Sequence, residues 1–266
     1  MKRIPVHTVQ AGDVSLAYHE SGSGDPVVFI GGLASTMDQW NPPVLEKFSR
    51  QFRVILFDNR GTGYSNESGE PFSIALFARD TANLMDALGI TRAHIIGHSM
   101  GACIAQEFAL EFPKRVNRLV LVAGDCGGSE AVKMQPEIRD RLTDKSGTVQ
   151  DMIRRMFSLL FPQQWLDTHD PFAYCPEVYE NTSDEIVARQ IETFFAWPGS
   201  YSRLGEIQSP TLVLTGDRDV IVPPKNAELL GSRIPDAQLV VFPDGGHGLM
   251  YQFPDRFCDT VLGFLD

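Results

Sequence analysis

The sequence is poor in basic residues. Its 266 residues include 23 Lys and Arg against 34 Asp and Glu, for a formal net charge of −11. A protein that binds nucleic acid needs a basic face to displace counterions from the phosphates, and binding to an anionic membrane surface needs similar charge. We therefore expect no nucleic-acid partner and no membrane partner, and take a small-molecule substrate as the partner.

Long hydrophobic runs and paired cysteines are also missing. No window approaches the roughly 18 uninterrupted apolar residues of a membrane span. Two positive charges near the N-terminus are followed by no apolar stretch, so we expect no secretory signal. The four cysteines are far apart, and we interpret each as a free buried thiol in a reducing cytoplasm. They are Cys103, Cys126, Cys175 and Cys258.

Short apolar segments alternate with helical patterns along most of the chain. Strands are predicted at residues 27–30, 54–57, 94–96, 119–122, 211–215 and 239–242. Two further segments, 6–9 and 14–19, flank a turn and are predicted to pair as an antiparallel hairpin. Helices are predicted at about 74–88, 100–112 and 254–265. This alternation predicts an α/β fold with a mostly parallel sheet of eight strands.

One long segment interrupts the alternation. From residue 128 to residue 204 there is no convincing strand, and the sequence is charged and helical with scattered aromatic side chains. We interpret residues 128–204 as a helical cap inserted into a core of residues 1–127 and 205–266. Most of its aromatic side chains should pack within the cap, while some line a substrate pocket. The predicted pocket residues are Trp40, Phe157, Phe161, Trp165, Phe194, Trp197, Val220 and Leu249.

The most informative motif is the pentapeptide Gly97-His98-Ser99-Met100-Gly101, between a predicted strand and a predicted helix. This is the G-x-S-x-G nucleophile elbow, in which a sharp turn lifts the serine hydroxyl clear of the sheet. The positions two before and two after the serine must lack side chains, because the turn presses them against neighbouring backbone. The motif predicts Ser99 as a nucleophile.

A serine nucleophile needs a base to take its proton. Of the six histidines, His247 lies in a glycine-rich loop directly after the last predicted strand, and we predict it as the general base. Asp219 follows an earlier strand and is predicted to orient the imidazole, in the chain order expected for this motif. Asp125 is the rival acid. His169 stands between aspartates, but its spacing matches no metal site, and we expect no metal.

The tetrahedral intermediate also needs backbone N–H donors for its oxygen. Met100 follows the nucleophile at a helix N-terminus and is predicted to supply one donor. The second is assigned to Leu33, in the loop Gly31-Gly32-Leu33 that follows a predicted strand. These glycines allow the backbone to approach the substrate closely.

Taken in order along the chain, five motifs resemble those of the α/β-hydrolase superfamily. They are Phe29–Gly32, Phe57–Ser65, Gly97–Gly101, Gly216–Asp219 and Gly245–His247. The chain looks like the capped, cofactor-independent serine hydrolases grouped with carboxylesterases, enol-lactone hydrolases and non-haem haloperoxidases. It departs from many relatives in having Gly31-Gly32 where they carry His-Gly, so the oxyanion loop needs other contacts. The resemblance implies no cofactor.

The resulting hypothesis is hydrolysis of a carboxylic ester or lactone of a small, uncharged, mainly apolar substrate through an acyl-Ser99 intermediate. Three alternatives use the same residues. One is hydrolysis of a carbon–carbon bond in a conjugated diketone from ring cleavage, and another is a perhydrolase or haloperoxidase activity. The third is a ligand sensor with little turnover. The sequence leaves open whether the protein is a monomer or a homodimer.

Overall fold

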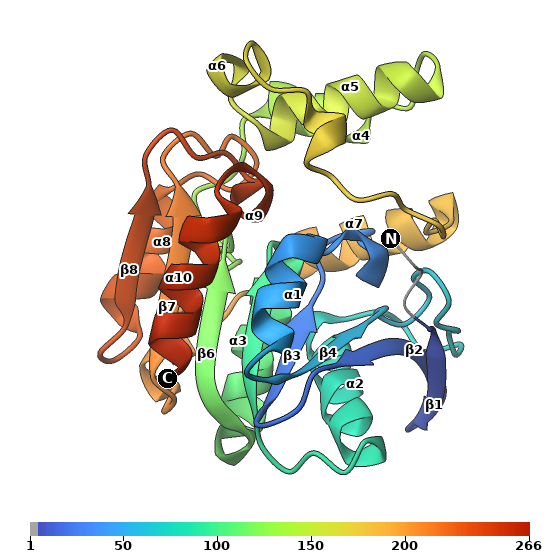
Figure 1. Ribbon diagram of the computed structural model, residues 1–266, viewed down its shortest axis with the longest axis vertical. Coiled ribbons are helices and arrows are strands. Elements are labelled where there is room, and N and C mark those ends of the chain that lie inside the picture. Colours follow the sequence, from blue (N-terminus) through green and yellow to red (C-terminus); the bar gives the residue numbers. More distant parts are fainter. Residues whose placement is uncertain (1–4) are drawn as a thin grey trace.

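A single sheet of eight strands forms the centre of the computed structural model, which describes residues 5–266 (Figure 1). The basic residues Lys2 and Arg3 lie outside the described residues. The strands are β1 (His7–Ala11), β2 (Val14–Ser21), β3 (Pro26–Ile30), β4 (Arg53–Phe57), β5 (Ala93–His98), β6 (Val116–Val122), β7 (Thr211–Gly216) and β8 (Gln238–Phe242). Their order is β1-β2-β4-β3-β5-β6-β7-β8. Strand β2 is antiparallel to both neighbours and every other pairing is parallel, which confirms the predicted sheet.

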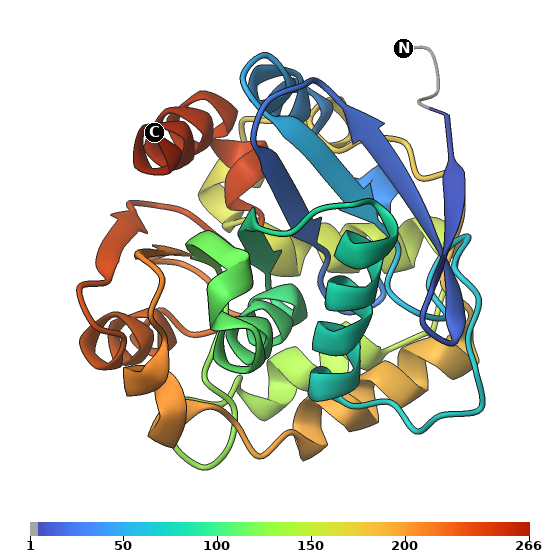
Figure 2. The ribbon, with the colours of Figure 1, turned by 90° about the horizontal axis from the view of Figure 1, so that it is seen from below.

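Helices cover both faces of the sheet, as Figure 2 shows from below. Helices α1 and α10 lie on one face, and α2, α3 and α8 lie on the other. The helices are α1 (Pro42–Ser49), α2 (Ile74–Ala87), α3 (Met100–Glu111), α4 (Pro136–Thr143), α5 (Val149–Leu160), α6 (Gln163–Leu166), α7 (Asp184–Ala196), α8 (Lys225–Arg233), α9 (Leu249–Gln252) and α10 (Pro254–Leu265). Four short 3₁₀ turns complete the assignment: η1 (Met37–Gln39), η2 (Pro113–Arg115), η3 (Pro171–Ala173) and η4 (Tyr201–Glu206).

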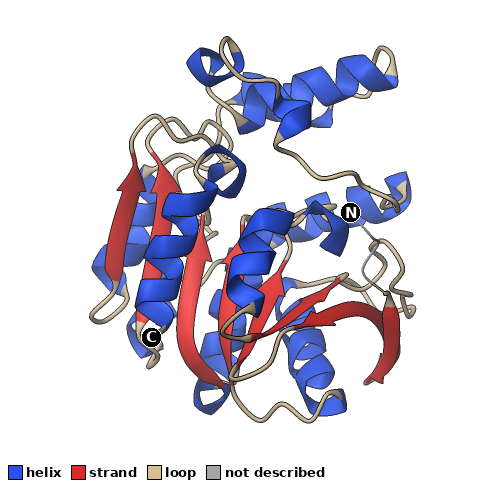
Figure 3. Cartoon of the chain, in the orientation of Figure 1, coloured by secondary structure: helices blue, strands red, loops and turns tan. Residues whose placement is uncertain are grey.

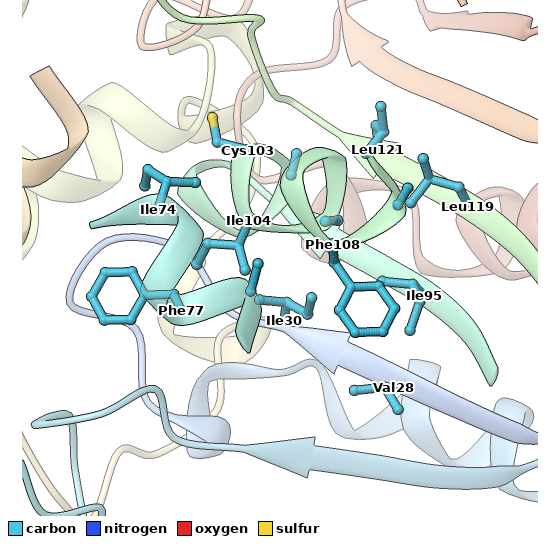
Figure 4. Close-up of a cluster of buried hydrophobic side chains, with 14 of the residues drawn as sticks. Val28, Ile30, Ile74, Phe77, Ile95, Cys103, Ile104, Phe108, Leu119 and Leu121 are labelled. Atoms are coloured by element: carbon cyan, nitrogen blue, oxygen red, sulfur yellow. The ribbon is translucent and has the colours of Figure 1, made fainter. Parts of the chain in front are cut away.

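The central strands are buried on both sides, which explains their nearly continuous apolar sequences. In β3, Val28 and Ile30 belong to the core on the α3 side, where Phe108 fills the space between strand and helix (Figure 4). The alternate residues Val27 and Phe29 belong to the core on the α1 and α10 side. The two cores hold the ends of the parallel strands in place, and those ends carry the candidate site.

Local sequence signals set the ends of several elements. The hydroxyl of Ser73 accepts a hydrogen bond from the Leu76 N–H and caps α2. Gly89 follows that helix with φ of +67°, a value that glycine tolerates and that ends the helix. Pro254 is the first residue of α10, where its missing N–H costs no helical hydrogen bond. The predicted starts of α2, α3 and α10 are confirmed.

The segment between β6 and β7 contains α4, α5, α6 and α7, and no strand forms in residues 123–210. We call these four helices the cap. They lie beyond the carboxyl ends of the parallel strands (Figure 3). In an open parallel sheet this is the edge where ligands bind. The cap therefore covers the expected position of a site.

The four cysteines are free thiols, as predicted. Three are buried, whereas Cys175 in the cap is only half-buried. Among the described residues, no helix combines the length and apolar character needed to cross a bilayer.

Candidate active site

Ser99 occupies a strained turn between β5 and α3. Its φ of +57° and ψ of −123° lie in a region that side chains other than glycine rarely adopt. The Ser99 N–H donates to the carbonyl oxygen of Val122 at 2.9 Å, which anchors the turn to β6. A Cβ atom at Gly97 would collide with the carbonyl oxygen of Gly101, and one at Gly101 would collide with that of Ile30. Both positions therefore require glycine.

A buried imidazole–carboxylate pair faces the same region. His247 lies in the loop after β8, and its Nδ1–H donates to Oδ2 of Asp219 at 2.8 Å. The other oxygen of Asp219 accepts the N–H groups of Ile221 and Val222, each at 2.9 Å. Three donors thus fix the carboxylate. Because Nδ1 is occupied, Nε2 is the nitrogen left to exchange a proton with a reacting group.

The rival acid Asp125 is not the partner of His247. It accepts the Gly127 N–H at 2.8 Å and lies close to the thiol of Cys103. Burial raises the pKa of Asp125, while the charge of Lys133 acts in the opposite direction. Asp125 therefore lies near Ser99 without orienting the imidazole.

The predicted oxyanion loop passes directly over the nucleophile. A Cβ atom at Gly32 would lie 3.1 Å from Cβ of Ser99, so a larger residue would press on the serine. The next residue, Leu33, lines the same cavity as Met100, the first residue of α3. The two N–H groups assigned to the oxyanion hole thus belong to segments that meet at Ser99.

A cap residue that the sequence analysis missed holds this loop. Oε1 of Gln190 accepts the Ala34 N–H at 2.8 Å, and its Nε2 donates to the hydroxyl of Thr62 at 2.9 Å. Gln190 is fully buried, and Ala34 is held at φ of +59°. Because the chain has Gly31-Gly32 where many relatives carry His-Gly, the predicted oxyanion loop needs other contacts. The two hydrogen bonds of Gln190 supply them. A signal existed, since Gln190 shares the apolar face of α7 with Val187 and Phe194.

The cap also contacts the loop of the histidine. The Gly248 N–H donates to the carbonyl oxygen of Leu160, the last residue of α5, at 3.0 Å. A Cβ atom at Gly248 would lie 2.6 Å from the ring of Phe161. From the core side, Nε2–H of His98 donates to the carbonyl oxygen of His247 at 3.2 Å. Burial lowers the pKa of His98 to about 3, so this neighbour stays neutral.

A cavity of about 430 Å³ separates the sheet edge from the cap, and Ser99 and His247 both line it. Of the predicted pocket residues, Trp40 and Phe194 contribute to its wall. The cap wall is mostly apolar, with Leu142 from α4, Met156 from α5 and Ile191 from α7. This shape suits a small ligand with a substantial apolar part.

The other six pocket predictions are corrected, beginning with the aromatic residues of the cap. Phe161 stacks on Trp165 at 4.6 Å between ring centres, and Phe157 packs against Phe161 at 6.0 Å. These three rings form the cap's own contact with the core instead of lining the cavity. The indole of Trp197 is buried elsewhere, with its N–H donating to Glu107 at 2.9 Å.

Two of the predicted pocket residues belong to the core domain, and in each case the next residue along the chain lines the cavity instead. Val220 is 42% exposed, whereas Ile221 lines the cavity. Leu249 is buried in the core, whereas Met250 lines the cavity. The direction of a side chain in a short loop or turn depends on tertiary packing, which residue type alone does not reveal.

The cap histidine that stands between two aspartates packs against an aromatic ring. His169 stacks on the indole of Trp165 at 4.6 Å. Among residues 5–266, no three His, Cys, Asp or Glu side chains gather closely enough to hold an ion.

Comparison with known proteins agrees with this fold. The chain belongs to the α/β-hydrolase family, whose model, described as the alpha/beta hydrolase fold, matches residues 25–254. It is 33% identical over 262 residues to a putative carbamate hydrolase RutD from Azorhizobium caulinodans, across 95% of this chain and 96% of that one. The predicted family resemblance is thereby confirmed.

Two solved structures show the same fold over nearly the whole length. One is a thermophilic esterase from Thermogutta terrifontis, with a TM-score of 0.82, 26% identity and coverage of 98% of each chain. The other is a meta-cleavage product hydrolase from Pseudomonas fluorescens IP01, with a TM-score of 0.78, 25% identity and coverage of 97% of this chain and 96% of that one. The three relatives are named for different substrates, so the family alone does not define this chain's substrate.

Proposed function

We propose that the protein is a serine hydrolase that cleaves a carboxylic ester or lactone through an acyl-Ser99 intermediate. The observation that carries the proposal is the hydrogen-bonded pair of His247 and Asp219 in the same cavity as the elbow serine. A serine at such a turn with an oriented imidazole nearby is the arrangement that acyl transfer requires.

The reaction follows from the roles available to these groups. Nε2 of His247 takes the proton of the Ser99 hydroxyl while Oγ attacks the substrate carbonyl carbon. The N–H groups of Leu33 and Met100 stabilise the negative oxygen. His247 then gives the proton to the departing alkoxide, and the carbon–oxygen bond breaks. Water, deprotonated by His247, attacks the acyl-enzyme in the same way and releases the carboxylic acid.

The test is turnover of p-nitrophenyl esters from acetate to long acyl chains. We expect multiple turnovers with an optimum chain length, nearly abolished in Ser99→Ala because triad members act as a unit. Ser232→Ala, on the distant helix α8, is the matched control and should keep the wild-type rate. A stoichiometric burst followed by silence would instead favour a sensor. Feeble ester rates with rapid cleavage of a coloured ring-cleavage product would favour a carbon–carbon hydrolase.

A carbamate is the second candidate substrate class. The 33% identical relative named as a putative carbamate hydrolase favours it. A carbamate carbonyl is attacked by the same nucleophile and needs the same oxyanion donors, so the mechanism is unchanged in outline. Assay of alkyl carbamates beside alkyl esters of equal length distinguishes the two classes by their ratio of kcat/KM.

A further inference from the structure

The cavity wall contains a group of basic side chains in a chain whose net charge is −11. Lys133, Arg139 and Lys145 all line the cavity, and all three come from the short segment that leads from β6 into α4 and α5. The acidic lining residues are Asp125 and Asp184. The local excess of positive charge is therefore opposite in sign to that of the whole molecule.

The three basic residues differ in how far their charge is already compensated. Lys145 forms an ion pair with Asp184 at 2.6 Å, which links the α4–α5 connection to α7. Lys133 is the cation whose charge acts on the carboxyl of Asp125, although burial still raises the pKa of that carboxyl above its usual value. Within residues 5–266, the guanidinium of Arg139 has neither an ion pair nor a hydrogen bond. The charge of this exposed side chain is therefore not compensated by a carboxylate of that part of the chain.

Arg139 is nevertheless held in a defined place. Its guanidinium carbon lies 4.6 Å from the centre of the Phe195 ring, and Phe195 lines the cavity from α7. Stacking on a ring uses the face of the guanidinium and leaves the N–H groups at its edge free. That edge matches the two oxygens of a carboxylate.

We infer that the substrate carries a carboxylate at the end remote from its scissile carbonyl, and that Arg139 binds this carboxylate with Lys133 nearby. The inference deepens the proposed function and rests on it. The carbonyl end lies at Ser99, and apolar side chains such as Val187 and Ile191 line the same cavity. The expected substrate is thus an amphipathic, singly anionic ester or lactone. It differs in charge from the uncharged substrate expected from the sequence.

The test compares matched ester pairs. The p-nitrophenyl half-esters of adipate, pimelate and suberate are assayed against p-nitrophenyl hexanoate, heptanoate and octanoate. A second arm compares 4-carboxyphenyl butyrate with 4-methylphenyl butyrate, because the carboxylate can belong to the acid or to the alcohol. In at least one arm, Arg139→Gln should lower the ratio of kcat/KM for the anionic over the neutral ester about tenfold, the size expected for one charge-assisted hydrogen bond.

The matched control is Arg141→Gln. Arg141 lies on the same helix and donates to the hydroxyl of Ser158 at 2.6 Å, away from the cavity. This variant should keep the wild-type ratio, and Arg139→Lys should restore part of it. An unchanged ratio in Arg139→Gln in both arms would overturn the inference while leaving the proposed function intact.

If no ester is hydrolysed, the proposed function is overturned. A binding measurement still tests the carboxylate site in that case. Monomethyl adipate, pimelate and suberate are titrated by calorimetry into Ser99→Ala. Binding that is weakened about tenfold when Arg139→Gln is added supports the carboxylate site. Binding that is absent, or equal with and without Arg139→Gln, overturns it.

Discussion

Replacing Gln190 tests whether the cap takes part in organising the oxyanion loop. Gln190→Leu keeps the side-chain volume but removes the acceptor for the Ala34 N–H and the donor to Thr62. The Thr62 hydroxyl can rotate, so the main cost is one poorly paired backbone N–H, about 1–3 kcal/mol of unfolding free energy. Outright loss of one oxyanion donor costs about 10²–10³ in kcat. Because the Leu33 donor is loosened and not removed, we expect a loss of about tenfold, roughly 1.4 kcal/mol.

The assay measures kcat on the best ester of the p-nitrophenyl series and unfolding by urea on the same preparations. Thr62→Val is the control, because it removes the second hydrogen bond of Gln190 and leaves the bond to Ala34 in place. It should lower stability by about 1 kcal/mol and keep kcat within twofold or so. A Gln190→Leu variant with reduced stability but unchanged kcat would refute the role of Gln190 in positioning the loop.

Three further predictions follow from the same contacts. Asp219→Asn keeps the side-chain size but no longer orients and stabilises the imidazolium, so kcat should fall about a thousandfold or more in steady-state assays. Gly101→Ala places a methyl group against the Ile30 carbonyl and should cost at least about 2 kcal/mol in urea unfolding. The hydrogen bond from Arg60 lowers the pKa of Asp13 to about 2 from its usual 3.8. That stabilisation is present above pH 4 and lost as pH falls toward 2, so the stability difference between wild type and Asp13→Asn should be smaller at pH 3 than at pH 6.

Each of these three predictions has a control variant or an outcome that would contradict it. Asp125→Asn should reduce kcat far less than Asp219→Asn, and an equal loss would contradict the assignment of the acid. Gly263→Ala, where an added Cβ atom meets nothing within 4 Å, should stabilise α10 by about 0.5–1 kcal/mol. A Gly101→Ala variant as stable as wild type would contradict the packing argument at the elbow. A stability difference for Asp13→Asn that is independent of pH would show that the ion pair is not its source.

Features that depend on adjacent residues were predictable from the sequence. The sheet, the turn at Ser99 and the approach of His247 to Asp219 follow from strand ends, glycine positions and chain order. The rest depends on contacts between residues far apart along the chain. Ala34 and Gln190, for example, are 156 positions apart, and only the rotation of α7 brings the amide to the loop.

The cavity wall shows the same limit. Ring type and hydrophobicity indicated Phe161 and Trp165 as pocket residues, but the same properties serve equally well in packing the cap onto the core. Arg139 is a charged residue on a polar helix, a pattern that indicates a solvated side chain, and the side chain is indeed exposed. Only the facing ring of Phe195 shows where its charge is held.

The bonds that tie the cap to the core constrain how this protein can be recombined with its relatives. One way to change the specificity of such a protein is to replace its cap with the cap of a relative. Here the cap supplies the Gln190 amide to the loop that contains Ala34 and the Leu160 carbonyl to the loop that contains His247. A chimera that receives a foreign cap would therefore lose rate as well as change selectivity. A chimera whose new cap also carries the equivalents of the Gln190 amide and the Leu160 carbonyl should recover the rate.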